Sequence, residues 1–165
     1  MLTKPFNGRC LFSLGNFNIQ MSCVTDIPFD WLGTCKFGLE NYTDVSLILA
    51  DHGNEYIVLL LMDKESRLLK DIEGKRSVDA YEIGLADFTE RLLMDIQDDF
   101  EEWVNWYPAK ILGGPDAGRK ESLETLLADT TETLENFKNS LQFGRAEKKE
   151  DRSVSQCLCG NVGKG

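Results

Sequence analysis

The stretch LADFTERLLMDIQDDFEEWVNWY, residues 85–107, carries the clearest structural pattern in this chain. Its apolar residues recur at intervals of three and four, which is the spacing of one face of an α-helix. They are Leu85, Phe88, Leu92, Ile96, Phe100, Trp103 and Tyr107. The pattern predicts one long amphipathic helix from about residue 85 to residue 107. Pro108 follows and does not fit a helix interior.

A second amphipathic helix is predicted from about residue 119 to residue 141. Its apolar side is formed by Leu123, Leu126, Leu127, Leu134, Phe137 and Leu141. Gly113-Gly114-Pro115 between the two helices is typical of a loop. Because this connection is short, we expect the two helices to be antiparallel neighbours.

The residues before these helices are mainly typical of β-strands. Residues 10–14 and 17–24 predict a hairpin, with Gly15-Asn16 as its turn. A short helix is then expected from Pro28 to about Phe37, capped by Asp26 or Thr25 and ended by Gly38.

Two apolar runs, residues 45–50 and 55–62, predict a pair of strands joined by Asp51-His52-Gly53-Asn54. The second run barely alternates, so we expect a central strand covered on both faces. Residues 67–72 predict a further strand, followed by a turn at 73–75.

Strands followed by helices indicate an α+β fold. We expect a mostly antiparallel sheet with the two long amphipathic helices packed on one face. The 165 residues are enough for one domain, which we place at residues 1–143. Residues 144–165 hold charged residues, Ser and Gly with little to bury, so they are predicted to form a mobile tail.

The composition restricts the partners of this chain. Eighteen Lys and Arg stand against 28 Asp and Glu, a formal net charge of -10. Such a charge disfavours direct binding to nucleic acid or to an anionic membrane surface. The longest apolar run, residues 56–62, is far shorter than the roughly 20 residues of a membrane-spanning helix. The five cysteines are odd in number and irregularly spaced, which favours reduced thiols and a cytoplasmic protein.

Most of the excess charge lies in one segment. Residues 79–107 contain nine acidic residues and one arginine, a net charge of -8. On a helix, a stripe away from the apolar face is formed by Asp87, Arg91, Asp95, Asp98, Glu102 and Asn105, and Asp99 and Glu101 broaden it. Like charges at these spacings destabilise a helix by a few tenths of a kcal/mol, about 0.2–0.5 per pair. Such a local conflict is typical of functional sites.

The acidic stripe has two interpretations. It is either a solvated helix face or a docking surface for a basic protein, such as the active-site cleft of a nuclease. In the second interpretation the contact residues are Asp95, Asp98, Asp99, Glu102 and Trp106. Trp103 is predicted to be in the core, whereas Trp106 falls off the apolar face and is predicted to be an exposed anchor.

Little in the sequence supports catalysis or a bound cofactor. His52 is the only histidine and lies in a predicted turn. The phosphate-binding motifs G-x-x-x-x-G-K-[ST] and G-x-G-x-x-G do not occur. Cys157-Leu158-Cys159 can bind a soft metal only with distant ligands, and carboxylates along one helix diverge. We therefore predict no catalytic residues, no metal and no cofactor. The alternatives left open are an enzyme or metal protein that uses the carboxylates, and a structural subunit of a larger assembly.

Two short stretches carry a resemblance to a known group of proteins. Ile27-Pro28-Phe29-Asp30-Trp31 enters a short helix, and Leu85-Ala86-Asp87-Phe88-Thr89-Glu90-Arg91-Leu92-Leu93 enters a later one, with strands between them. This order resembles SUKH-type and related bacterial immunity proteins, including those of contact-dependent growth inhibition. The resemblance implies a non-catalytic inhibitor that binds a toxin. With the acidic stripe, it makes a basic toxin, such as a nuclease, the expected partner.

Overall fold

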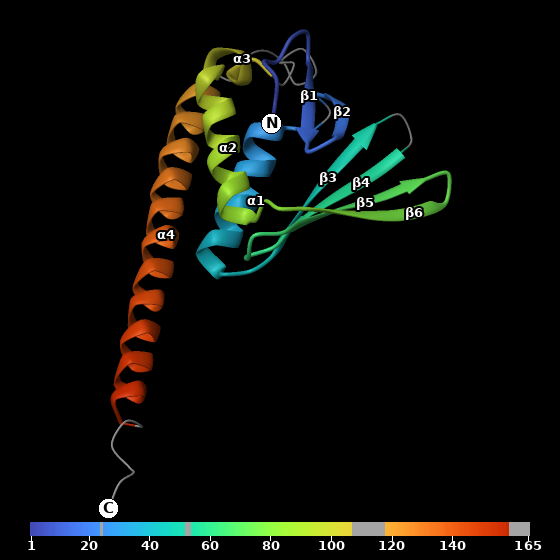
Figure 1. Cartoon of the computed structure of the whole chain (residues 1–165). Helices are drawn as coiled ribbons and strands as arrows, with labels where there is room; N and C mark the ends of the chain where they lie inside the picture. The colour runs from blue at the N-terminus through green and yellow to red at the C-terminus, as the bar shows by residue number, and fades with distance from the viewer. Residues whose placement is uncertain (24, 52–53, 107–117, 159–165) are drawn as a thin grey trace, which may run out of the picture.

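The computed structural model describes the backbone of residues 1–23, 25–51, 54–106 and 118–158, and the side chains of these residues except 50–55 and 142–158. The fold is α+β, as the sequence predicts (Figure 1). In chain order, the elements are β1 (Arg9–Leu14), β2 (Phe17–Ser22), α1 (Ile27–Asn41), β3 (Val45–Asp51), β4 (Asn54–Leu60), β5 (Ser66–Ile72), β6 (Lys75–Tyr81), α2 (Leu85–Asp98), α3 (Phe100–Val104) and α4 (Arg119–Leu158).

The strands form two antiparallel sheets, a β1–β2 hairpin and a four-stranded sheet in the order β3-β4-β5-β6. The turn predicted at Gly15-Asn16 is confirmed, and the turn predicted at residues 73–75 occupies residues 73–74, because Lys75 already begins β6. Strand β6 is absent from the sequence prediction, because Lys-Arg-Ser-Val-Asp-Ala-Tyr contains few apolar residues. It forms through seven register pairs with β5, from Ile72↔Lys75 to Ser66↔Tyr81. His52 and Gly53, in the predicted turn between β3 and β4, lie outside the described residues.

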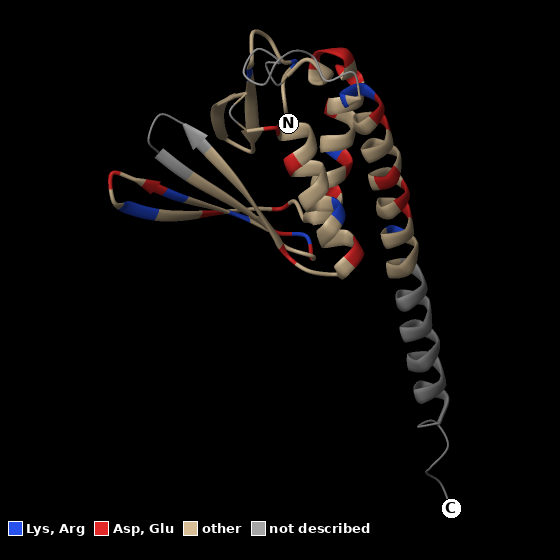
Figure 2. Cartoon of the chain, turned by 180° about the vertical axis from the view of Figure 1, so that it is seen from behind, with Lys and Arg blue, Asp and Glu red and all other residues tan. Residues whose placement is uncertain are grey.

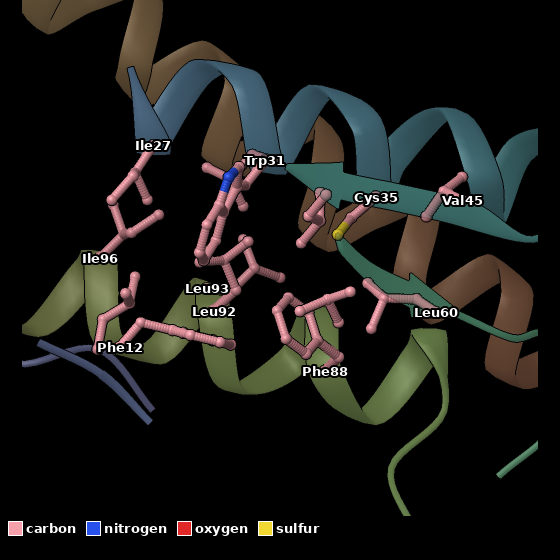
Figure 3. Packing of buried hydrophobic residues seen from close by; sticks show 14 of the residues in the cluster. Phe12, Ile27, Trp31, Cys35, Val45, Leu60, Phe88, Leu92, Leu93 and Ile96 are labelled. Atoms are coloured by element: carbon pink, nitrogen blue, oxygen red, sulfur yellow. The ribbon is translucent and has the colours of Figure 1, made fainter. Parts of the chain in front are cut away.

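The core lies between the helices and the strands. Figure 3 shows Trp31 and Cys35 of α1 facing Phe88 and Leu92 of α2. Phe12 of β1 completes this layer, with its ring edge-on to Trp31 at a centroid distance of 5.2 Å. These five side chains are at most 2% exposed. Helices α2 and α4 pack against α1 and against each other, while α1 packs against β3, so the helices lie on one side of the sheet (Figure 1).

The predicted ends of the first two helices are wrong. Helix α1 continues past Gly38 to Asn41 and ends at Tyr42 in the left-handed region. Gly38 instead allows a close approach, because an added Cβ would lie 2.7 Å from Val45 and 2.8 Å from Leu85. The long helix predicted over 85–107 is interrupted at Asp99, whose φ of -119° and ψ of 38° are not helical. After this break, the indole Nε1 of Trp103 donates to the carbonyl oxygen of Asp95 at 3.2 Å.

The far face of the four-stranded sheet is not covered by any described residue. Ile48 and Val78 on this face are 63% and 60% exposed. The prediction that β4 is covered on both faces is therefore wrong. The opposite face is buried where α1 and the β1–β2 hairpin lie against it; the ring centroids of Phe17 of β2 and Tyr56 of β4, for example, are 5.2 Å apart.

The second long helix, predicted to end at about residue 141, continues to Leu158, so its predicted end is wrong. The domain boundary predicted at residue 143 therefore falls inside α4. The continuation follows from the absence of Pro and from the high helix propensity of Ala, Glu, Lys and Arg in this segment. The mobility expected of residues 144–165 stays a prediction, and residues 159–165 lie outside the described part of the chain.

Candidate acidic interface

The predicted acidic residues lie where the end of α2, helix α3 and the N-terminal residues 1–8 meet. We call this region the acidic end and define it by its five carboxylates, Asp95, Asp98, Asp99, Glu101 and Glu102. Figure 2 shows acidic residues gathered at this end of the helical layer, next to the start of α4. The structure brings the five together, but it also gives four of them partners within the chain.

Asp95 holds the N-terminal residues in place. Its Oδ2 accepts a hydrogen bond of 2.6 Å from the backbone N–H of Leu2, and the Met1 amine lies 3.4 Å away. The segment continues beside β1, where Thr3 N donates to Leu11 O at 3.0 Å. The side chain of Asp95 is only 22% exposed. Asp95 therefore has a structural role, which is to hold the N-terminal residues against α2.

Lys4 binds two further carboxylates. Its Nζ lies 2.6 Å from Glu102 Oε1 and 3.5 Å from Asp99 Oδ1. The hydrogen bond from Lys4 lowers the pKa of Glu102 from its usual value, and the same bond raises the pKa of Lys4. The like-charge repulsion expected from the sequence is partly relieved by this cation.

Asp98 is exposed and has no ion-pair partner among the described residues. Glu101 is also exposed and pairs with Lys120 at the start of α4. Among the described residues, the five carboxylates form ion pairs with three cations: the Met1 amine, Lys4 and Lys120. Because three cations stand against five carboxylates, the acidic end keeps a net negative charge.

The prediction that Trp106 is an exposed anchor is wrong. Its side chain is 2% exposed, and its Nε1 donates to the carbonyl oxygen of Thr25 at 2.8 Å. Its ring lies 5.1 Å from that of Trp103. The chain leaves the helix after Val104, so the helical wheel that placed Trp106 off the apolar face does not apply. Trp103, predicted to be in the core, is fully buried.

The exposed aromatic residue at the acidic end is Phe6, which the sequence analysis missed. It is 76% exposed. It precedes a two-residue turn in which Asn7 and Gly8 both have positive φ, 49° and 68°. Phe6 and Arg9 exchange backbone hydrogen bonds of 2.8 and 3.0 Å across this turn. The Asn-Gly dipeptide is a strong hairpin signal and could have identified this turn.

Phe6 also borders a shallow open hollow of about 390 Å³. The hollow is lined by Pro5, Phe6, Asn7, Gly8, Glu101, Glu102, Asn105 and Trp106. Carboxylates thus stand beside an exposed aromatic ring on a turn that is fixed by its own backbone hydrogen bonds. This arrangement fits a partner that offers both a basic and an apolar group.

The remaining chemistry is sparse in the part of the chain that the structure describes. No group of three or more His, Cys, Asp and Glu is arranged there to hold a metal ion. Burial raises the pKa of the Cys10 and Cys35 thiols to about 12, so both stay protonated and unreactive near neutral pH. His52 and Cys159 lie outside the described residues, and the side chain of Cys157 is not described.

Within the described ranges, no helix combines the length and the apolar character needed to span a membrane. Comparisons with protein-family models, with curated proteins and with solved structures found no match to this chain.

Proposed function

We propose that this chain is a non-catalytic, cytoplasmic binding protein of the immunity or antitoxin type, whose acidic end binds a basic protein. The observation that carries the proposal is the placement of Phe6, 76% exposed on a tight turn, beside a group of carboxylates with net negative charge. Single exposed apolar side chains are common on protein surfaces, so the exposure of Phe6 supports the proposal only together with the carboxylates beside it. Aromatic side chains are the usual anchors of protein interfaces.

The electrostatics favour a cationic partner. Asp98 and Glu101 are exposed and can face lysines or arginines of another protein. Asp99 and Glu102 share Lys4, whose side chain is 60% exposed, so an incoming arginine can replace this pairing. An arginine fork matches a carboxylate better than an ammonium group does. Opposite potentials also speed encounter and disfavour acidic competitors.

A nuclease toxin would present such a surface. Its cleft must attract phosphates and therefore carries lysines and arginines. The acidic end, with the exposed ring of Phe6 beside it, could occupy that cleft in place of nucleic acid. In this proposal Asp98, Asp99, Glu101, Glu102 and Phe6 make the contact, while Asp95 positions the N-terminal residues.

The test is a pull-down from lysate of the source cell at low and moderate salt, followed by titration calorimetry with the retained protein. One variant combines Asp98→Lys with Glu101→Lys, and a second is Phe6→Ser. The matched control, Glu132→Lys with Glu135→Lys, makes the same change in net charge on exposed positions of α4. Asp95 is left unchanged because its replacement would release Leu2.

We expect one basic protein to be retained by the wild type and by the control, with weaker retention at higher salt. Each variant at the acidic end should lower its affinity at least about tenfold, the loss typical of an interface hot spot. Equal losses in the control would mean that net charge alone is responsible. Unchanged binding by both test variants would contradict the proposal.

A further inference from the structure

The uncovered face of the four-stranded sheet carries a continuous apolar row. Ile48 of β3, Ile57 of β4, Leu69 of β5 and Val78 of β6 are directly paired across the strands. Ile48, Leu69 and Val78 are 63%, 37% and 60% exposed. We propose that this face binds the same face of a second copy of the chain and forms a twofold-symmetric dimer.

The four residues of this row differ from scattered exposed apolar residues because strand pairing places them side by side. Isolated apolar side chains are common on protein surfaces, but four in one cross-strand row form a contiguous patch. In Figure 1 the helices and the hairpin lie on the opposite side of the sheet, and no described element covers this side. Antiparallel sheets that bury both faces do so by packing a second layer about 10 Å away. A second copy supplies such a layer.

Charge complementarity favours a second copy as the occupant. On β5, Arg67 and Asp71 lie two residues to either side of Leu69 and on the same face. When two copies face each other across a twofold axis along the apolar row, Arg67 of each copy lies opposite Asp71 of the other. Their side chains are 51% and 42% exposed. Within one copy Arg67 pairs with Glu65 and Asp71 pairs with Arg76, but these pairs are exposed and can exchange partners. The twofold arrangement therefore allows one Arg67–Asp71 ion pair between the copies on each side of the apolar contact.

The location of the net charge is also consistent with self-association. The chain carries -10 overall, which opposes contact between copies. The acidic end lies on the helical side, whereas the described charged residues of the uncovered face are Arg67, Asp71 and Arg76. Repulsion between copies is therefore smaller at this face than at the helical surface.

The expected dimer is weak. Strands spaced about 4.8 Å apart and three rows spaced about 6.7 Å along them give about 400 Å² of sheet for each copy. A stable interface buries about 800 Å² for each partner. Association should therefore depend on concentration, and it leaves the acidic end free for another partner.

Sedimentation velocity and light scattering of the full chain, from about 10 µM to about 1 mM, test this proposal in the range where small interfaces associate. We expect the average mass to rise toward that of a dimer. Ile48→Lys and Val78→Lys should each weaken association at least about tenfold. Met94→Lys is the matched control, because Met94 is 57% exposed on α2 and its replacement changes the net charge equally.

A charge exchange tests the arrangement of the two copies. Arg67→Asp should weaken the dimer, and adding Asp71→Arg to the same chain should restore it. Phe6→Ser should leave the dimer intact, so that this proposal and the proposed function fail separately. Circular dichroism and thermal unfolding check that each variant is folded. A wild type that stays monomeric over the whole range would overturn the proposal, as would equal weakening by Met94→Lys.

Discussion

Arg119 and Asp26 form a paired contact between the first turns of α4 and α1. Nη1 and Nη2 of Arg119 each donate a hydrogen bond of 2.7 Å to a different carboxylate oxygen of Asp26. Nε of the same guanidinium donates to the carbonyl oxygen of Val104 at 2.9 Å, and its carbon lies 4.6 Å from the ring centroid of Phe29. Asp26 occupies the N-cap position of α1, but its carboxylate does not cap the helix. It binds Arg119 instead.

Replacing Arg119 by Lys should therefore destabilise the fold. Lysine keeps the charge but cannot make the bidentate contact or reach Val104 O at the same time. Because the two side chains are only 15% and 22% exposed, we expect a loss of about 2–4 kcal/mol in the free energy of unfolding. Urea denaturation of Arg119→Lys, Asp26→Asn and the double variant measures the coupling. Additive losses would mean that the two residues do not act together.

Two glycines of α1 should respond oppositely to alanine. A Cβ at Gly38 would lie 2.7 Å from Val45 Cγ1 and 3.1 Å from the Thr43 carbonyl oxygen, so Gly38→Ala should cost about 1–3 kcal/mol through overpacking. A Cβ at Gly33 meets nothing within 4 Å, so Gly33→Ala should stabilise the helix by up to about 1 kcal/mol. Thermal unfolding of both variants measures the difference. A gain in stability with Gly38→Ala would contradict this packing.

Asp95 and Asp98 lie on the same helix but should differ in their effect on stability. Asp95→Lys removes the acceptor of the Leu2 N–H and places a second cation beside the N-terminus, so we expect a loss of about 1–3 kcal/mol. Asp98→Lys changes an exposed side chain and should stay within about 0.5 kcal/mol of the wild type. Chemical denaturation of both variants measures the free energy of unfolding. The rate of proteolysis within residues 1–8 measures whether the N-terminal segment is still held in place. Equal effects would show that Asp95 does not hold this segment.

The buried thiols predict a labelling pattern and a pH dependence. In a Cys157→Ser, Cys159→Ser background, a thiol reagent at pH 8 should modify the half-buried Cys23 first and reach Cys10 and Cys35 only after unfolding. Burial raises the folded-state pKa of Cys10 and Cys35 from 9.0 to about 12. Between these values the unfolded chain loses protons that the folded chain keeps, so stability should fall as the pH rises above about 9. Rapid labelling of all three thiols in the folded protein would contradict this burial.

Much of the fold follows from local patterns in the sequence. The spacing of Leu85, Phe88, Leu92 and Ile96 determines α2, and the apolar runs that became β3 and β4 are correctly placed. These predictions succeed because burying one face requires a fixed period, and that period is visible in the sequence. Strand β6 is not predicted because it lies at the edge of the sheet and most of its side chains are exposed. Its sequence therefore shows no regular alternation of apolar and polar residues.

At the acidic end, the positions of the charges along the chain follow from the sequence, but the partners of these side chains follow from the packing of distant segments. The sequence located the negative charge on α2 and α3 and identified Trp103 as a core residue. Only the tertiary structure placed Lys4 on Asp99 and Glu102, buried Trp106 against Thr25 and left Phe6 exposed. Helical periodicity describes contacts within about one turn, whereas these contacts join residues that are far apart in the chain. Their partners depend on how the N-terminal residues, α1 and α3 pack together, and no local pattern encodes that packing.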